Sequence, residues 1–264
     1  MTDFDRDVDP AEEAFDPVAD ANENLRRAFG ILAEEARSGE FRQFGPLTVA
    51  SAGVQAPLFN RVFVFDVPPV GELSAAVAWM ADRDVPFWVT ATDPAVEVVE
   101  RHRADLDLVK AGEQPGMALA PLDEISPVDS AAEVTEVADP DEREEFSTVT
   151  ASAFDWPRDV VEPVDRAALA ADDARLFLGR VEGRPAASGL LVRTGQVAGV
   201  YTIGVVEEFR RRGVGEAMTR EVLRAGREAG CRVGVLQSSE MGYPLYERMG
   251  FETVVTYHHF EPAT

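Results

Sequence analysis

The feature that most constrains the fold is a basic, glycine-rich turn, Arg210-Arg211-Arg212-Gly213-Val214-Gly215. It follows an apolar run ending near Val206 and opens a segment with helical spacing that continues to about Ala229. The first turn of a helix has backbone N–H groups without intrahelical acceptors, and the helix dipole adds partial positive charge there. Glycines let a ligand approach the backbone, and arginines add forked donors. The pattern therefore predicts a phosphate site at a helix start.

Two other phosphate-binding loops do not fit. A P-loop needs a lysine directly after its second glycine, whereas the single lysine of this chain, Lys110, lies far from the turn. A dinucleotide-binding fingerprint needs a third glycine, but Gly213 and Gly215 are followed by Met218. An ordinary tight turn is the remaining alternative, and the segments downstream argue against it.

Composition excludes several classes of partner. The chain has 264 residues, and its 45% hydrophobic content is enough for a substantial core. Asp and Glu number 48 against 25 Lys and Arg, a formal charge of -23, which excludes nucleic acids and anionic membranes as partners. Such an acidic chain with one lysine is typical of a halophilic protein, so we expect its stability to rise with salt.

Targeting, disulfide and metal signals are also absent from the sequence. No apolar run approaches the length of a membrane span and no signal peptide pattern opens the chain, so we expect a cytoplasmic protein. The single Cys231 allows no internal disulfide and is interpreted as a packing residue. His102, His258 and His259 have no ligands at metal-binding spacing, so no metal site is expected.

The chain divides into two halves. We expect an acidic, poorly ordered lead-in over residues 1–20, a first domain over 21–122, a linker over 123–132 and a second domain over 133–264. In the first domain the patterns predict helices over 23–38, around Leu73 to Met80, and from a cap at Asp93 to about 103, with strands over 47–51, 58–67, 86–90, 107–110 and 117–119. In the second they predict strands over 134–138, 175–181, 186–192, 197–206, 232–237 and 251–260, with helices capped by Asp139 or Asp141 and over 160–171, 214–229 and 242–249.

The second half resembles the GNAT acyltransferase superfamily. The order of its elements matches, the turn has the spelling R-x-x-G-x-G, and the family's closing motif is similar to Ser239-x-x-Gly242-x-x-Leu245-Tyr246-Glu247-Arg248-Met249-Gly250-Phe251. The first half resembles the degenerate N-terminal half of tandem GNAT proteins. Its corresponding helix start, Pro68 to Glu72, lacks both the arginines and Gly-x-Gly, so we expect no cofactor there. The resemblance implies an α+β fold of two GNAT-like domains, each a mixed, mostly antiparallel twisted sheet flanked by helices.

The resemblance also implies a site for acetyl-CoA. The pyrophosphate would bind backbone N–H groups from about Arg211 to Glu216, and the pantetheine arm would pair along the strand at Ile203, Gly204 and Val205. An N–H near Val205 or Val206 would polarise the thioester carbonyl. Tyr246 would act as the general acid on the leaving thiolate. The expected cofactor-binding residues are Ile203, Gly204, Val205, Arg210, Arg211, Arg212, Gly213, Val214, Gly215, Glu216 and Ser239.

Departures from the family pattern leave the general base unassigned. Ser239 stands where many members have asparagine, and Gly199 stands where some have a glutamate base. The base then comes from a set of polar residues near the predicted site, or the amine loses its proton to bulk water through a water chain. These candidates are Glu240, Tyr201, Thr202 holding a water, and His258 or His259.

The function most favoured is N-acetylation of a small-molecule or peptide amine by direct attack in a ternary complex, by a monomer or homodimer. A non-catalytic acyl-CoA sensor is the main alternative, and transfer of a longer acyl chain would need an apolar tunnel. The acceptor itself is not specified. Asp155, Asp159, Glu162 and Asp165 would favour a cationic amine unless they belong to the general acidic surface. Asn60 and Phe63 either line the acceptor cleft or serve the core and a turn.

Overall fold

One sheet of eleven strands runs through the whole molecule. The computed structural model describes residues 15–122, 125–126, 128 and 130–263. The order of strands in the sheet is β1-β2-β3-β4-β11-β5-β10-β9-β8-β7-β6. The strands are β1 (Glu40–Phe44), β2 (Leu47–Ser51), β3 (Asn60–Val64), β4 (Trp88–Ala91), β5 (Leu108–Leu119), β6 (Ala132–Glu136), β7 (Ala174–Val181), β8 (Arg184–Thr194), β9 (Val197–Val205), β10 (Val233–Gln237) and β11 (Glu252–Pro262).

The α+β class is confirmed, and the sheets of the two halves are joined into one. Only the pairs β3–β4 and β9–β10 are parallel, and all other neighbours are antiparallel. The join is made by the last strand of each half: β5 lies beside β10 of the second half, and β11 lies beside β4 of the first. A sequence divided at its linker therefore folds as one continuous sheet.

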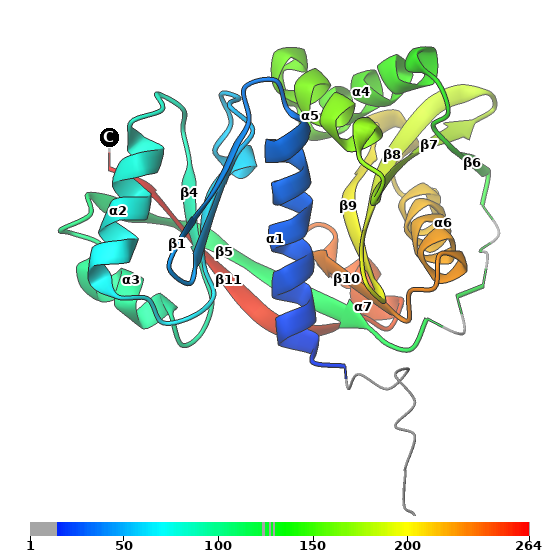
Figure 1. Ribbon diagram of the computed structural model, residues 1–264. Coiled ribbons are helices and arrows are strands. Elements are labelled where there is room, and N and C mark those ends of the chain that lie inside the picture. The colour runs from blue at the N-terminus through cyan, green and yellow to red at the C-terminus, as the bar shows by residue number, and fades with distance from the viewer. Residues whose placement is uncertain (1–14, 123–124, 127, 129, 264) are drawn as a thin grey trace, which may run out of the picture.

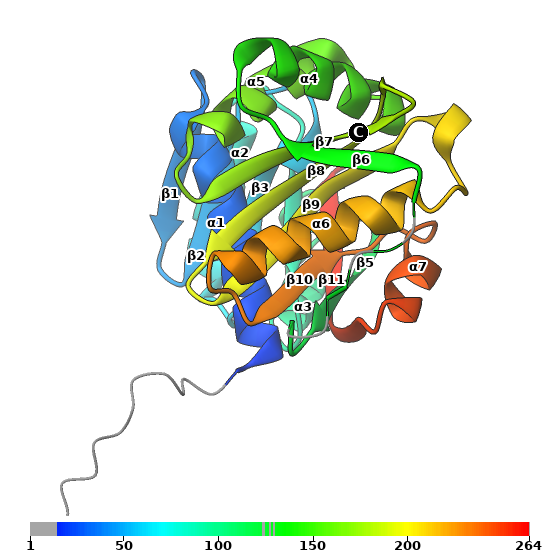
Figure 2. The same cartoon turned by 90° about the vertical axis from the view of Figure 1, so that its right-hand side faces the viewer.

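Helices cover both faces of this sheet. They are α1 (Pro17–Glu35), α2 (Val70–Ala81), α3 (Val96–His102), α4 (Pro140–Phe154), α5 (Arg158–Ala170), α6 (Val214–Glu228) and α7 (Tyr243–Arg248), with short 3-10 turns η1 (Pro57–Phe59) and η2 (Glu207–Phe209). Helices α1, α4 and α5 share one core cluster, α2 and α3 pack over a second, and α6 and α7 over a third. Figure 1 shows α1 standing between the two halves, and Figure 2 shows α6 lying across the strands of the second half. None of the helices in the described part of the chain is long and apolar enough to cross a membrane.

The helix before the first strand begins earlier than its apolar spacing predicts. It starts at Pro17 because the Asp16 carboxylate accepts hydrogen bonds from Val18 N and Ala19 N, and proline is favoured at the first helical position. The predicted lead-in therefore ends at about residue 16 rather than 20. Its first fourteen residues lie outside the described part of the chain, as do residues 123, 124, 127 and 129 of the predicted linker.

Three other predictions need correction. The cap at Asp93 is wrong, because α3 begins at Val96 and no side chain caps it. The strand β1 was not predicted, since its burial pattern is almost wholly exposed. The two short strands over 107–110 and 117–119 are parts of β5, which continues through Pro115 because its neighbour β11 keeps the register there.

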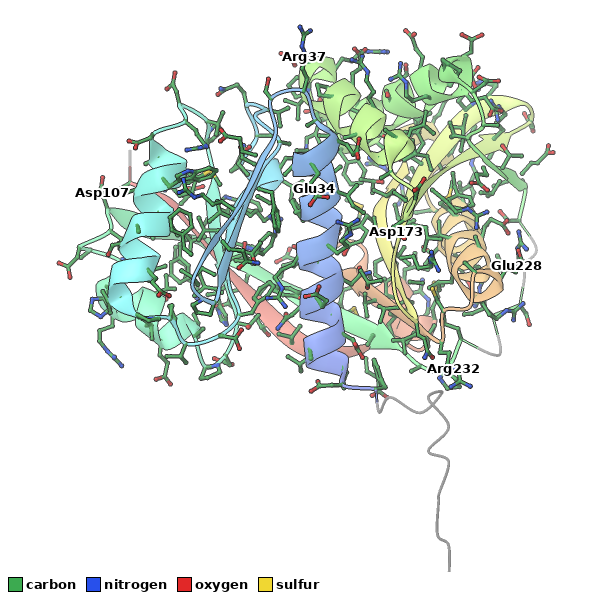
Figure 3. The ribbon with its side chains drawn as sticks, viewed as in Figure 1. Glu34, Arg37, Asp107, Asp173, Glu228 and Arg232 are labelled. Carbon is green, nitrogen blue, oxygen red and sulfur yellow. The ribbon has the colours of Figure 1, made fainter. Side chains whose placement is uncertain are left out.

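The helix α1 fixes the first half against the second. Asn24 is fully buried, and its Nδ2 donates to Val192 O and to Thr194 Oγ1, both at 2.9 Å. Its Oδ1 accepts a 2.6 Å hydrogen bond from the Tyr201 hydroxyl of β9. Figure 3 labels Glu34 of α1 and Asp173 across the same seam, and Arg27 pairs with both. The strand expected to hold the cofactor is therefore braced by a residue of the other half.

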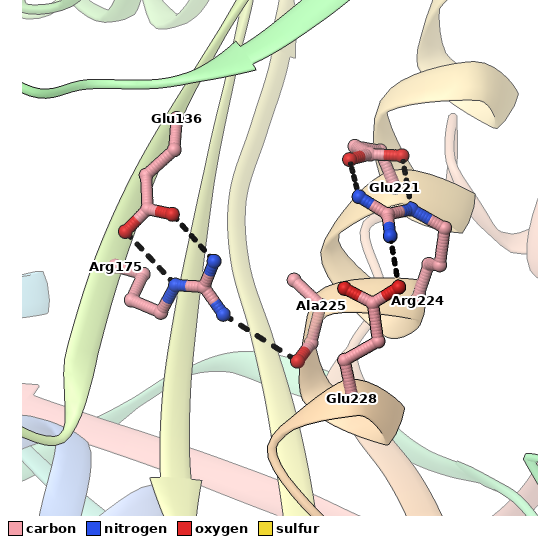
Figure 4. Close-up of polar contacts among 6 residues, drawn as sticks. All are labelled: Glu136, Arg175, Glu221, Arg224, Ala225 and Glu228. Carbon is pink, nitrogen blue, oxygen red and sulfur yellow. Dashed lines mark hydrogen bonds and ion pairs between the residues drawn. The ribbon is translucent and has the colours of Figure 1, made fainter.

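A hydrogen bond ties the end of α6 to the sheet edge, and ion pairs lie on the sheet and on the helix beside it. Arg175 of β7 pairs with Glu136 of β6 and donates to Ala225 O near the end of α6 at 3.5 Å (Figure 4). On the helix itself, Arg224 pairs with Glu221 and Glu228. A cation near a helix C-terminus is favourable. These pairs are largely exposed, so each contributes about 1 kcal/mol or less.

Candidate active site

The two parallel strands of the second half separate and leave an opening in the sheet. Strand β10 pairs with β9 only at Val197, Ala198 and Gly199, which are the first three of the nine residues of β9. Further along, β9 bulges away from β8, because the register shifts between Ser188 and Leu190 and Thr202 has a backbone φ of 47°. The last part of β9 consequently has no neighbour on its β10 side.

The backbone of β9 directs one N–H into this opening. Val206 N donates to Ala186 O at 2.9 Å, so its N–H is used by β8. Val205 is opposite Ala187 in the register. Because successive residues of an antiparallel ladder point to opposite sides, Val205 N–H points away from β8 and toward the opening. Of the two N–H groups proposed for the thioester carbonyl, only that of Val205 is free to serve.

The basic turn begins α6 beside the opening. Arg211 and Gly213 have φ values of 59° and 75°, and Gly213 is the N-cap residue of the helix. The first hydrogen bond of the helix is donated by Ala217 N to Gly213 O, so the N–H groups ahead of it have no helical acceptor. No atom lies within 4 Å of where a Cβ on Gly213 would stand. The turn therefore presents an accessible row of donors to an anion.

The loop, the end of β9 and the closing motif come together. A Cβ built on Gly215 would lie 3.6 Å from Val205 Cγ2 and 3.7 Å from Leu245 Cδ2. Tyr246 follows Leu245 in α7 and lies beside Thr219, one turn along α6 from Gly215. Segments that are distant in the sequence thus surround a single opening, as the two motifs together predict.

The three arginines of the turn have different roles. The Arg210 guanidinium donates to Val205 O and to Ala153 O, each at 2.9 Å, so it holds the turn to β9 and to the end of α4. Arg211 and Arg212 are exposed, and Arg212 lies 5.8 Å from the centre of the Phe209 ring. Positive charge at the turn therefore comes mainly from Arg211 and Arg212.

Tyr246 has a hydroxyl that stays protonated over a wide pH range. The residue is 8% exposed and packs edge-on against Phe251, with ring centres 5.8 Å apart. Burial raises its pKa to about 12, and the Thr219 hydroxyl beside it acts in the opposite direction. A phenol that is neutral at physiological pH can donate a proton to a basic leaving group.

Two other predicted residues have structural reasons for their identity. A Cβ on Gly204 would meet Phe154 Cε2 at 2.7 Å and Ser188 Oγ at 3.0 Å, so close packing of α4 requires glycine there. The Ser239 hydroxyl accepts from Gly242 N at 3.2 Å and steadies the start of α7. Val214 is buried in the core under α6, and Glu216 pairs with Arg220.

A cavity of about 220 Å³ reaches this opening from the side of α1. Ile203, Ser239 and Tyr246 lie at one part of its wall, and apolar residues of α1, η1 and α5 form much of the remainder. An adjoining cavity of about 380 Å³ shares Leu58, Gln114 and Ser239 with it. The first half therefore supplies much of the surface that an acceptor would meet.

The residues first considered for the acceptor do not line this cavity. Asn60 is buried at the start of β3, where it bonds Ser51, Val54 O and neighbouring backbone, and Phe63 packs against Phe29 in the core. The four acids of the α4–α5 region are also outside it: two are exposed, Glu162 pairs with Arg158, and Asp165 is buried on α5. Arg61, which sequence reasoning missed, does line the cavity. A charged residue within the apolar run from Phe59 to Phe65 was the available signal.

The candidates for the general base are mostly engaged elsewhere. His259 lies under Trp88, contacts Thr90 Oγ1 at 3.1 Å, and has its pKa lowered to about 3 by burial. His258 contacts Glu113, and Tyr201, whose pKa burial raises, donates to Asn24.

Two polar atoms remain available for an acceptor. Glu240 is exposed beside the adjoining cavity, away from the main one. Thr202 Oγ1 and Gln237 Nε2 are buried without hydrogen-bond partners, and both residues line the main cavity. In the described part of the chain, no cluster of three His, Cys, Asp or Glu could hold a metal ion. Cys231 is buried, and burial raises its pKa to about 11.

Comparison with known proteins agrees with this geometry. The sequence model described as an acetyltransferase (GNAT) domain matches residues 129–237. A search of curated proteins found no match. Among solved structures, a GCN5-related N-acetyltransferase from Kribbella flavida is 18% identical with a TM-score of 0.68, over 92% of this chain and 95% of that one.

Two further structures share the fold. A GCN5-related N-acetyltransferase from Sphaerobacter thermophilus is 16% identical with a TM-score of 0.59, over 81% of this chain and 76% of that one. A functionally unknown conserved protein from Staphylococcus epidermidis is 16% identical with a TM-score of 0.61, over 85% of this chain and 94% of that one. Residues 129–237, which include the R-x-x-G-x-G turn beside the opened sheet, are thus similar to a GNAT acetyltransferase domain, and the chain as a whole shares the fold of these solved structures.

Proposed function

We propose that the protein is an N-acetyltransferase that moves the acetyl group of acetyl-CoA to the amine of a small molecule or peptide. The observation that carries this proposal is the opening between β9 and β10, with the basic turn at its rim and a cavity behind it. A thioester can enter from the side of α6 while an amine enters from the side of α1. Two substrates that meet from opposite sides need no covalent enzyme intermediate.

The donor is held by backbone and by charge. Its pyrophosphate lies on the N–H groups from Arg211 to Glu216, with the side chains of Arg211 and Arg212 around it. The pantetheine arm runs along the unpaired edge of β9 from Ile203 to Val205, where it adds as a strand would. Ser239 faces the arm from the start of α7. The first half, whose α2 begins without such a turn, binds no cofactor.

The chemical step uses one N–H and one hydroxyl. Val205 N–H stabilises negative charge on the thioester oxygen while the neutral amine attacks the carbonyl carbon. The C–S bond then breaks, and the Tyr246 hydroxyl gives its proton to the thiolate. The nitrogen loses one proton as the amide forms, and this proton returns to the Tyr246 oxygen through solvent. Thr202 Oγ1, which has no hydrogen-bond partner among the described residues, accepts an N–H of the amine and orients it.

A second function, acyl-CoA sensing without turnover, is favoured by one observation. In the described residues, the cavity wall has no carboxylate and no imidazole that would serve as a base. Both functions require the same donor site. They differ in whether Tyr246 transfers a proton.

The experiment is an assay of thiol release from acetyl-CoA with a panel of amines, made with the wild type and with Tyr246→Phe. We expect the substitution to lower kcat about 100- to 10,000-fold, the usual worth of an acid–base group, with little change in acetyl-CoA affinity. Tyr243→Phe is the matched control, because it removes a hydroxyl of the same helix that contacts Thr253 at the surface. Tight acetyl-CoA binding without thiol release from any amine would instead support the sensor.

A further inference from the structure

Arg61 is a buried cation in the middle of an apolar strand. It is 2% exposed, and its Nε donates to Leu58 O at 2.8 Å while Nη1 lies 3.5 Å from Thr90 Oγ1. The guanidinium carbon is 4.6 Å from the centre of the Phe29 ring and 5.2 Å from that of Trp88. The two rings and the two oxygens hold the fork in one position.

No anion balances this charge. Among the described residues, Arg61 has no ion pair with any Asp or Glu, although the chain has 48 of them, and Nη2 has no hydrogen-bond acceptor. Burial lowers the pKa of Arg61 to about 9, so the group still has its proton at neutral pH. Burying an unpaired charge is costly, and contact with aromatic rings offsets only part of that cost. Arg61 is therefore a buried cation without the carboxylate partner that many surface arginines of this acidic protein have.

Arg61 lines the cavity of about 220 Å³ that meets the β9–β10 opening. Among the described residues, the cavity wall contains no Asp or Glu. It also contains no Lys, no His and no second Arg, so Arg61 is the one charged side chain that an occupant meets there. The surrounding surface is apolar and aromatic, with Phe29, Phe59 and Trp156 among its residues. Such a wall suits an apolar body with one anionic group.

We propose that Arg61 binds a carboxylate of the acceptor, so that the acceptor is an amine that also carries a carboxylate on an apolar frame. Its carboxylate takes the open Nη2 position, and its amine points to Thr202 and Tyr246 at the other part of the same cavity. This assignment rests on the proposed acetyltransferase function, whose substrate class it specifies. It replaces recognition of a cationic amine by the acids of α4 and α5, none of which reaches the cavity.

The first test measures binding without turnover. The probes are 3-phenylpropanoate and 4-methylpentanoate, each compared with its neutral amide, and the readout is tryptophan fluorescence because Trp88 lies against Arg61. We expect each carboxylate to bind about 10- to 100-fold more tightly than its amide, as hydrogen bonds to a charged group would give. In Arg61→Met this preference disappears, and in Arg61→Lys part of it remains. Equal binding of acids and amides to the wild type would overturn the proposal.

Controls separate a failed site from a failed fold. Arg175→Met removes an arginine that pairs with Glu136 and does not line the cavity, and it should keep the preference. Arg61→Met should bind acetyl-CoA normally and melt no lower than the wild type, since replacing a buried unpaired charge by an apolar side chain is often stabilising. If Arg61→Met does not fold, the comparison rests on Arg61→Gln, which keeps a polar side chain without the charge and in which an unchanged preference would contradict the proposal.

The second test asks which substrate has the carboxylate. Thiol release is measured with phenylalanine and leucine against phenylethylamine and 3-methylbutylamine, using acetyl-CoA and then succinyl-CoA. A preference for the amino acids with acetyl-CoA that is lost in Arg61→Met supports the acceptor assignment. A preference for succinyl-CoA with the simple amines, lost in the same variant, would place the carboxylate on the acyl group and overturn it. Carboxylate binding without any thiol release would refute the acetyltransferase function while leaving Arg61 as an anion site.

Discussion

The two halves of the molecule contain the same unit of two parallel strands joined by a helix, but only one unit is open. In the first, β3 and β4 pair from Arg61–Trp88 to Val64–Ala91, at the ends of both strands. In the second, β9 and β10 pair over three residues and then separate beyond a bulge at Thr202. The difference teaches that the opening in the sheet comes from incomplete strand pairing, so the proposed binding site depends on that pairing as much as on the residues of the turn.

The helix starts of the two units differ in a matching way. The N-cap residue of α2 is Pro69, which has no N–H, and no arginine precedes it in the turn. The N-cap residue of α6 is Gly213, with arginines before it and open space around it. Proline removes a backbone donor, and without arginines the start of α2 has no added positive charge for an anion. The closed unit therefore has a start suited to packing, and the open unit has one suited to phosphate.

Among substitutions that would make the start of α6 as unsuited to an anion as the start of α2, we expect Gly213→Asp to lower acetyl-CoA affinity the most. The new carboxylate would stand where the pyrophosphate binds, and since like charges in contact cost several kcal/mol, acetyl-CoA affinity should fall more than about 100-fold. The matched control is Gly183→Asp, a turn glycine with φ of 76° and equally open surroundings. Calorimetric titration with acetyl-CoA measures both, and unchanged affinity in Gly213→Asp would count against the whole donor site.

A smaller effect is expected when the turn is loosened rather than blocked. In Arg210→Met, the carbonyls of Val205 and Ala153 lose their shared donor, and acetyl-CoA affinity should fall about tenfold through misplacement of the turn. Arg212→Met removes one exposed charge and should cost about threefold. Titrations at low and high salt separate the two, because salt screens the exposed charge and leaves the effect of Arg210. Equal salt dependence would contradict the different roles assigned to these arginines.

The smallest expected effect concerns Tyr246, whose ionisation should cause no change in kcat over the alkaline pH range. An ordinary tyrosine would lose its proton near pH 10, and a general acid is lost as pH rises through its pKa. Because burial raises the pKa of Tyr246 to about 12, kcat should show no decline from this group between about pH 9 and 11. Rates measured with a buffer series check this, using an acceptor whose amine is already neutral at about pH 9. A fall centred near pH 10 that is absent in Tyr246→Phe would show an unburied hydroxyl.

The residues of the proposed donor site could be named from sequence because their signals are local. The R-x-x-G-x-G spelling requires only one turn and one helix, and Tyr246 follows from a second compact motif. The single sheet was not readable in this way, because Gly112 and Pro115 interrupt the β pattern of β5, whose length depends on pairing with β11. Arg61 was missed for a related reason. Its meaning depends on Phe29, Trp88 and a cavity to which distant segments contribute.

The exchange of final strands between the halves has a consequence for how the chain is made. Strand β4 gains its second neighbour only when β11, which follows every strand of both halves in the sequence, becomes available. Until then the nascent first half presents an unsatisfied edge, to which other chains can add. Pairings of such long sequence separation form slowly, so the complete sheet should assemble late in folding. The segment between the halves is thus a boundary in the sequence but no boundary for folding, and loss of the C-terminal strand should damage both halves together.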